Sequence, residues 1–152
     1  MASHPRRLAL PLGLALLVAA LACATQPPGG VTPPAFRTAA SDGEWHLMEL
    51  AGRPAPLGAG GRRATLVFDR DTARAGGFGG CNRYGASYVV TADSLRFTAP
   101  VSTKMACEDG MELERELHGV LEGTRRYRMR EDDLRLLGEL GDELARFERR
   151  RP

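Results

Sequence analysis

The chain of 152 residues contains three cysteines, and their thiols are the groups whose spacing most directly suggests chemistry. Cys81 lies in the segment Gly-Gly-Phe-Gly-Gly-Cys-Asn-Arg-Tyr at 76–84, and Cys107 ends Ser-Thr-Lys-Met-Ala-Cys at 102–107. Each segment lies at the end of a predicted strand. An even number of cysteines in an oxidising compartment favours a disulfide, so we predict a Cys81–Cys107 bond. Two neighbouring thiols without a bond are the alternative.

The third cysteine, Cys23, follows a short apolar segment at the N-terminus. Arg6 and Arg7 precede the apolar residues 8–22. A run of about 15 residues is too short for a membrane-spanning helix, which needs roughly 20. Residues 1–22 are therefore predicted to be a secretory signal peptide. Ala20-Leu21-Ala22-Cys23 resembles a bacterial lipobox, which makes Cys23 the predicted lipidation site; ordinary secretion without lipidation is the alternative.

A lipidated Cys23 determines the expected location. Several acyl chains anchor a protein stably to a membrane, whereas a single chain binds marginally. Ala24 stands where an aspartate would signal retention in the inner membrane of a Gram-negative cell. We therefore expect a lipid-anchored protein of the cell envelope, at the outer membrane and facing the periplasm. Cys81 and Cys107 would then be the cysteine pair of an extracytoplasmic domain.

The charge and composition of the rest of the chain indicate its partners and its division into segments. The chain has 21 basic and 19 acidic residues, and the predicted signal peptide contains two of the arginines and no acid. The mature part is therefore near neutral, which argues against nucleic acid as a partner. Residues 23–42 are predicted to be a lipidated N-terminus and a proline-rich tether. One domain is expected at 43–148, followed by a basic tail at 149–152.

Hydrophobic periodicity indicates short strands and one helix. Alternating residues predict strands at 44–50, 64–68, 73–78, 84–91, 95–98, 126–130, 134–136 and 144–147. Asp109 is the predicted cap of a helix that ends at Gly123, with an apolar stripe at Leu113, Leu117, Val120 and Leu121. This pattern predicts an α+β fold in which one main helix packs against a strongly curved antiparallel sheet.

No catalytic or metal-binding set is predicted. Ser87, Ser94 and Ser102 lack the context of a nucleophile elbow. Three histidines and no Cys-x-x-Cys motif predict no metal site, and no cofactor is expected. The glycines at 76–80 predict a tight turn, because no Gly-Lys-Ser/Thr follows them. Glu112, Glu114 and Glu116 fit a solvated helix face. We therefore expect a protein that is not an enzyme.

The two cysteine segments also resemble a known family. Trp45, Phe68-Asp69, Gly80–Tyr84, Thr103–Cys107 and Met111 followed by Glu114 are similar to the META domain family, which includes the heat-shock lipoprotein HslJ. The resemblance implies a sheet and helix arrangement likened to a cracked barrel. It also implies that the protein is a bacterial envelope lipoprotein linked to heat or antibiotic stress. No catalytic residues are established in this family.

Polar and apolar residues beside the cysteines are the candidate motif surface: Asn82, Arg83, Tyr84, Thr103, Lys104, Met105 and Glu114. Their polar members could form a hydrogen-bond network that joins the two motifs, or the rim of a binding groove. The function that we expect is a lipid-anchored, stress-related envelope protein or an adaptor for another envelope protein. The alternative is a binder of a small apolar or lipid ligand within the curved sheet.

Overall fold

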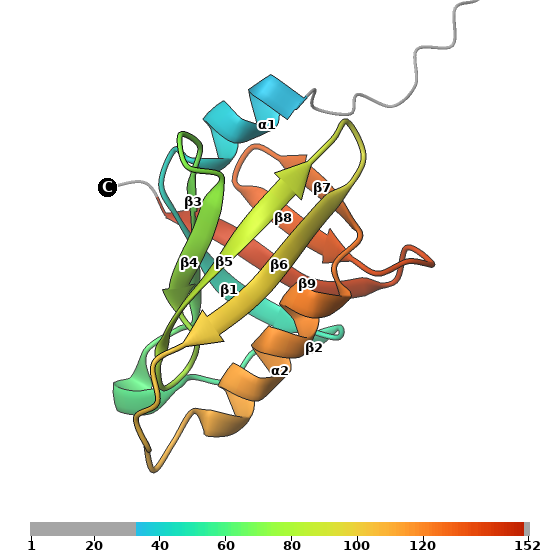
Figure 1. Ribbon diagram of the computed structural model, residues 1–152. Helices are drawn as coiled ribbons and strands as arrows, with labels where there is room; N and C mark the ends of the chain where they lie inside the picture. Colours follow the sequence, from blue (N-terminus) through green and yellow to red (C-terminus); the bar gives the residue numbers. More distant parts are fainter. Residues whose placement is uncertain (1–32, 151–152) are drawn as a thin grey trace, which may run out of the picture.

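The computed structural model describes residues 33–150, which form a curled antiparallel sheet with a helix at each end (Figure 1). The helices are α1 (Pro33–Ala40) and α2 (Met111–Gly123), with a short 3-10 helix, η1 (Ala59–Gly61). The strands are β1 (Glu44–Leu50), β2 (Arg53–Pro54), β3 (Thr65–Asp69), β4 (Arg74–Phe78), β5 (Arg83–Val90), β6 (Leu95–Ser102), β7 (Arg126–Arg130), β8 (Asp133–Leu137) and β9 (Glu143–Arg150). The predicted strands are all found, β6 and β9 run further than expected, and β2 was missed.

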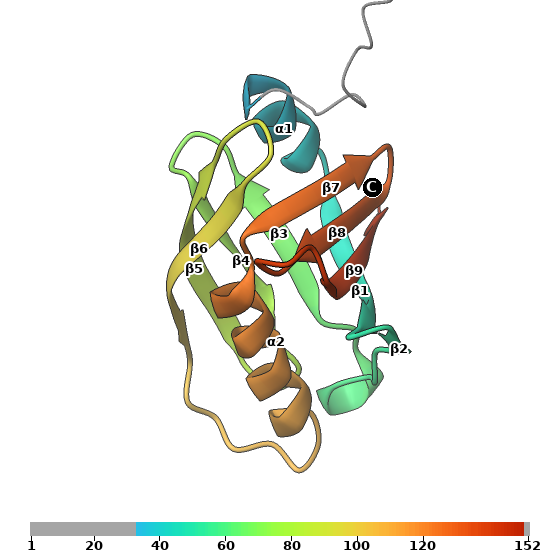
Figure 2. The same cartoon turned by 90° about the vertical axis from the view of Figure 1, so that its right-hand side faces the viewer.

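The sheet is a barrel with one split. Its strand order is β6-β5-β4-β3-β1-β9-β8-β7, and β2 pairs with β1. The end strands β6 and β7 approach each other at the Ser94–Arg126 bridge, beside which the Leu95 N–H donates to the Arg125 carbonyl at 3.1 Å. Below this point α2 lies against the opening (Figure 2). The predicted α+β fold, with a curved antiparallel sheet and one main helix, is confirmed.

Alternating side chains explain why these segments are strands. In β7, Tyr127 and Met129 point into the barrel and are buried, whereas the three arginines that alternate with them are exposed. The interior is filled with large side chains, many of which have no exposed surface, among them Trp45, Phe36, Phe147, Leu66, Leu95, Leu134 and Leu136. Burial of these apolar groups is the main stabilising contribution to such a fold.

Helix α2 closes the split in the sheet with its apolar stripe. Leu113, Leu117 and Leu121 are buried, and Val120 packs at the edge of the core. The predicted cap at Asp109 is wrong. Gly110 precedes the helix with φ 88°, a left-handed conformation that glycine adopts without strain, and no side chain caps the first turn.

The predicted tether is too long, because its last part belongs to the folded domain. Residues from Pro33 onward form α1, and Phe36 and Ala40 in this helix are fully buried. The ring of Phe36 packs on Phe68 and Tyr127, with centroids 5.5 and 4.5 Å away. Prolines are tolerated in the first turn of a helix, where the N–H groups have no intrahelical partner. The signal peptide, Cys23 and residues 24–32 lie outside the described residues.

The predicted basic tail also begins too early. Arg149 belongs to β9, and its side chain is 4% exposed because the guanidinium lies 4.6 Å above the ring of Trp45. It pairs with the carboxylates of Asp42 and Asp132. A cation over a buried indole is attracted by the ring electrons. Arg149 is therefore part of the packing that closes this end of the barrel.

Candidate functional site

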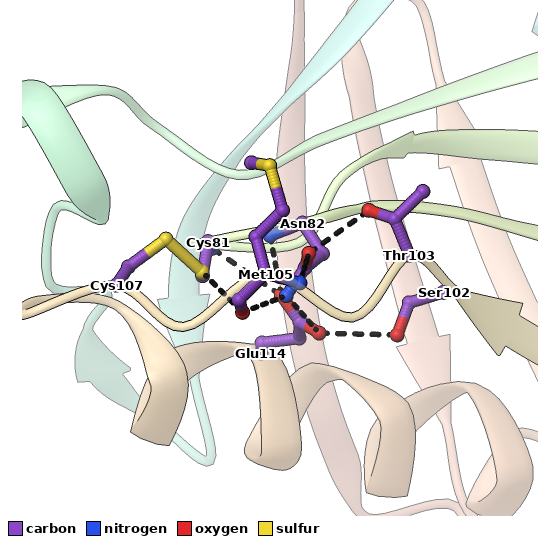
Figure 3. Close-up of a disulfide and its surroundings, with 7 residues drawn as sticks. All are labelled: Cys81, Asn82, Ser102, Thr103, Met105, Cys107 and Glu114. Carbon is purple, nitrogen blue, oxygen red and sulfur yellow. Dashed lines mark hydrogen bonds between the residues drawn. A yellow bond between two sulfur atoms is a disulfide. The ribbon is translucent and has the colours of Figure 1, made fainter.

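The two cysteines lie in loops at one end of the barrel. Cys81 is in the turn between β4 and β5, and Cys107 is in the segment that leads from β6 to α2. Their sulfur atoms are bonded, and their Cα atoms are 5.8 Å apart (Figure 3). That separation is typical of a disulfide that the backbone accommodates. The predicted Cys81–Cys107 bond is confirmed, and the alternative of two free thiols is wrong.

Glu114 lies beside this disulfide, in the first turn of α2, and it is only 8% exposed. Its Oε2 accepts hydrogen bonds from the backbone N–H groups of Cys81 (3.3 Å) and Asn82 (2.6 Å). Its Oε1 accepts from Asn82 Nδ2 (3.2 Å) and Ser102 Oγ (3.1 Å). A buried carboxylate is costly unless such donors surround it. The prediction of a solvated position is wrong for Glu114, although Glu112 and Glu116 are exposed.

Asn82 connects the two motifs from the other side. Its Oδ1 accepts from Thr103 Oγ1 (2.9 Å) and from the backbone N–H of Met105 (2.7 Å). Its Nδ2 donates to the Met105 carbonyl at 3.1 Å as well as to Glu114. Asn82 itself is 2% exposed, and both its amide oxygen and its amide nitrogen form their hydrogen bonds within the protein.

We call this set the disulfide clasp: Cys81, Asn82, Ser102, Thr103, Met105, Cys107 and Glu114. It joins three segments that are far apart in the sequence, namely the β4–β5 turn, the end of β6 with the loop behind it, and the start of α2. The hydrogen-bond network that the sequence predicted is therefore present for Asn82, Thr103 and Glu114. Ser102 was missed, because nothing in the sequence indicates where a serine hydroxyl points.

The remaining candidate residues lie around the clasp and outside its network. Arg83 and Lys104 are exposed, and their side chains pair with nothing among residues 33–150. Met105 takes part through its backbone, and its side chain is exposed. Tyr84 is buried, and its hydroxyl donates to the Thr65 carbonyl at 2.8 Å. Burial raises the pKa of Tyr84, so it stays a neutral phenol.

Close backbone packing holds the β4–β5 turn in place. Gly80 has φ 134°, and its carbonyl accepts a hydrogen bond from the Ala59 N–H at 2.7 Å. A Cβ atom on Gly58 or on Gly110 would lie within 2.2 Å of that carbonyl oxygen. A larger residue at Gly58 or Gly110 would therefore push its segment away from the β4–β5 turn. The loop at 58–61 therefore supports the β4–β5 turn directly.

The chemistry of the clasp is structural. The carboxylate of Glu114 and the amide of Asn82 are fully engaged, which leaves neither of them to act as a base or a ligand. His118 lies near Tyr84, with ring centroids 6.0 Å apart, and its Nε2 is buried without a hydrogen-bond partner in the described part of the chain. Within residues 33–150 no three His, Cys, Asp or Glu side chains are placed to hold a metal ion.

Comparison with known proteins agrees with this geometry. The family model described as META domain matches residues 38–151. The chain belongs to the META domain family. The match includes both cysteine motifs, α2 and all nine strands. The family supports a bacterial protein of the cell-envelope type, and it is not a known enzyme family.

Solved structures resemble this META domain protein in fold. An NMR structure of a protein from Burkholderia xenovorans is 26% identical with a TM-score of 0.60, and 99% of each chain is covered. A second NMR structure, 15% identical, has a TM-score of 0.58 over 74% of this chain and 92% of the other. The crystal structure of a DUF4847 family protein from Bacteroides vulgatus is 12% identical, with a TM-score of 0.52 over 74% and 96%. No curated protein matches the chain.

Among residues 33–150, no helix has the length and apolar character needed to cross a membrane.

Proposed function

We propose that this META domain protein is a lipid-anchored, non-enzymatic protein of the bacterial cell envelope, facing the periplasm, where it acts in stress tolerance as an adaptor for another envelope protein. The observation that carries the proposal is the Cys81–Cys107 disulfide, since structural disulfides persist in oxidising compartments outside the cytoplasm. The lipobox-like sequence before Cys23 supports the anchor.

Since α1 starts at Pro33, the tether between Cys23 and the folded domain is shorter than the sequence predicted. An extended chain spans at most about 3.3–3.6 Å per residue, so residues 23–32 reach roughly 35 Å. An anchored domain would thus remain close to the membrane surface and would meet partners there. Helix α1 would be its membrane-proximal end.

An apolar groove supports the adaptor role. It has a volume of about 530 Å³ and lies between α2 and the β8–β9 turn, with Leu50, Val120 and Leu144 in its lining. Leu140 stands at its rim with 95% of its surface exposed. Exposed apolar surface beside a groove is typical of protein contact sites. The interior of the sheet, by contrast, is packed with aromatic and leucine side chains, so nothing favours the alternative of an apolar ligand within it.

Fractionation of cells that express the full chain tests the anchor. The unmodified protein is expected to sediment with membranes and to carry the mass of acyl chains at Cys23. A Cys23→Ala variant is expected to become soluble, while the neighbouring Thr25→Ala variant stays with the membrane. If the signal peptide of Cys23→Ala is removed and the protein still sediments with membranes, the anchor proposal is wrong.

A photo-crosslinking amino acid tests the adaptor role. Placed at Leu140 in intact cells, it is expected to give a discrete adduct with one envelope protein. The same group at Arg128, on the exposed face of β7, is the matched control and is expected to give none. Equal labelling at both positions would contradict a specific contact at the groove.

A further inference from the structure

A second groove crosses the outer face of the sheet, over β3, β4 and β5, and has a volume of about 610 Å³. Gly76 and Gly85 lie directly opposite each other in β4 and β5, and both line this groove. Val67 is the partner of Gly76 on the other side, in β3. Because two adjacent strands have no side chain here, the sheet surface is hollow at this point.

The fold requires one of these glycines but not the other. A Cβ atom on Gly76 would lie 2.6 Å from the Tyr84 carbonyl oxygen, which real structures avoid. A Cβ atom on Gly85 would meet nothing nearer than a guanidinium nitrogen of Arg74 at 3.6 Å. Glycine weakens a strand interior, and it often marks a place where a ligand approaches the backbone. Gly85 also lies beside a register shift in the pairing of β5 with β6, between Gly85 and Ser87. A side chain would nevertheless fit at Gly85, so its absence leaves the surface above this residue open to a ligand.

Four arginines surround the hollow: Arg62, Arg63, Arg74 and Arg83. Among residues 33–150 none of them forms an ion pair with a carboxylate. Arg62 lies 3.8 Å from the centroid of the Phe78 ring, and Arg63 donates to the Leu47 carbonyl at 3.5 Å.

The two acids in the groove have partners other than the four arginines. Glu44 lies 2.9 Å from His46. The Oδ1 atom of Asp69 accepts the backbone N–H groups of Asp71 and Thr72, at 2.9 and 3.1 Å. Four arginines and two acids give the groove two net positive charges when His46 is neutral.

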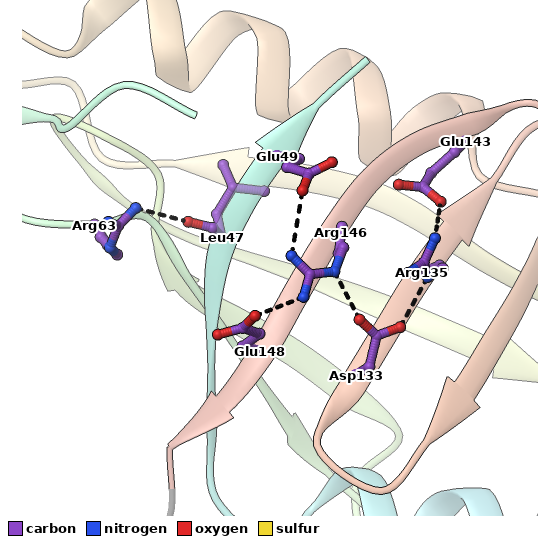
Figure 4. A network of polar contacts seen from close by, with 8 residues as sticks. All are labelled: Leu47, Glu49, Arg63, Asp133, Arg135, Glu143, Arg146 and Glu148. Carbon is purple, nitrogen blue, oxygen red and sulfur yellow. Dashed lines mark hydrogen bonds and ion pairs between the residues drawn. The ribbon is translucent and has the colours of Figure 1, made fainter. Parts of the chain in front are cut away.

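Part of the outer surface in the opposite half of the barrel differs from this groove. There Arg146 pairs with Glu49, Asp133 and Glu148, and Arg135 pairs with Asp133 and Glu143 (Figure 4). The outer surface thus neutralises Arg135 and Arg146, whereas the arginines beside the glycine hollow, like those of β7, form no ion pair with a carboxylate in the described part of the chain.

We propose that this groove binds a phosphate-bearing ligand, whose phosphate is held by Arg74 and Arg83 and whose organic part lies over Gly85. A guanidinium group can donate two parallel N–H···O hydrogen bonds to the oxygens of one phosphate. A phosphate monoester carries a charge of about −1.5 to −2 at pH 7, which matches the groove better than the single charge of a carboxylate. The phosphate could come from a soluble ester or from a lipid headgroup. The inference uses neither the lipid anchor nor a partner protein, so it goes beyond the proposed function.

Titration of the full chain, labelled with ¹⁵N, tests the site. Glycerol 3-phosphate is the soluble probe, and sodium acetate at equal ionic strength is the control. The amide signals of Val67, Gly76 and Gly85 are expected to shift with glycerol phosphate and not with acetate. The Arg74→Gln/Arg83→Gln variant is expected to bind about tenfold or more weakly, because each guanidinium supplies charge-assisted hydrogen bonds. Arg128→Gln, which makes a charge change outside the groove, is expected to bind normally.

Vesicles distinguish the two sources. Vesicles that contain phosphatidic acid, whose phosphate is a monoester, indicate a lipid headgroup if they shift the same amides and phosphatidylcholine vesicles do not. A response to glycerol phosphate alone indicates a soluble ester. Gly85→Val is expected to keep the thermal midpoint of the unmodified chain and to lose binding, because its side chain fills the hollow. The proposal is overturned if no probe shifts these amides, if acetate acts equally, or if Arg128→Gln weakens binding as much as the groove variant.

Discussion

The carboxylate of Glu114 accepts the backbone N–H of Asn82 at 2.6 Å, across 32 residues of sequence. This contact fixes the first turn of α2 against the β4–β5 turn, at the place where the barrel is split. The disulfide between Cys81 and Cys107 joins the same turn to the segment before the helix. The disulfide and the hydrogen bonds of Glu114 therefore both hold α2 over the split in the sheet.

The first prediction concerns Glu114. Replacing it by Gln exchanges one acceptor oxygen for an amide that faces donors, so a buried donor loses its partner. We expect Glu114→Gln to lower the free energy of unfolding by about 1–3 kcal/mol. Urea denaturation of both proteins measures this. Glu116→Gln, an exposed change in the same helix, is the control, and equal stability of the two variants would contradict the role given to Glu114.

The second prediction concerns the disulfide. In the chain-entropy model, closing a loop of this length stabilises a protein by about 3.5 kcal/mol. The Cys81→Ala/Cys107→Ala variant is therefore expected to unfold at a clearly lower urea concentration. Adding a reducing agent should destabilise the unmodified protein by a similar amount and should leave the variant unaffected. A variant as stable as the parent protein would show that hydrogen bonds alone hold the clasp.

Much of the fold could be predicted from the sequence, because its signals are local. Tyr127 and Met129 alternate with arginines, which identifies β7 with its observed limits. Leu113, Leu117 and Leu121 recur at helical spacing, and all three are buried in α2. The Cys81–Cys107 pairing followed from the number of cysteines and the expected compartment.

The errors arose where distant contacts decide the outcome. Phe36 looked like part of a proline-rich linker, and its burial depends on Phe68 and Tyr127, which come later in the chain. Arg149 looked like the start of a charged tail, but it lies over Trp45 from the other end of the domain. Glu114 was assigned to a solvated face, since a helical pattern cannot show that a turn from elsewhere supplies donors.

The third prediction tests α1. Because Phe36 is fully buried against two aromatic rings, Phe36→Ala leaves a cavity and is expected to cost about 3–5 kcal/mol of stability. Thr38→Ala, on the exposed side of the same helix, is expected to change stability by less than about 0.5 kcal/mol. Thermal unfolding of the full chain measures both. If the two variants melt at the same temperature, α1 does not contribute to the core.

The last prediction concerns pH and Asp133. Burial raises the pKa of Asp133, but hydrogen bonds from Arg135 and Arg146 outweigh it and hold the pKa below the ordinary value of 3.8. A depressed pKa stabilises the folded state above the unfolded pKa, and this contribution disappears as the pH falls through the lower, folded value. Asp133→Asn is therefore expected to lower the free energy of unfolding by about 1 kcal/mol at pH 7 and by nothing at a pH below the folded pKa. The cost at pH 7 is small because a partly exposed ion pair contributes little.

Urea denaturation of the Asp133→Asn variant and the parent protein, from pH 7 down into the acid range, measures the difference. Asp71→Asn, whose side chain is 87% exposed, is the control with no expected trend. A cost for Asp133→Asn that stays constant down to the lowest pH would mean that the residue acts through packing, with no contribution from its charge.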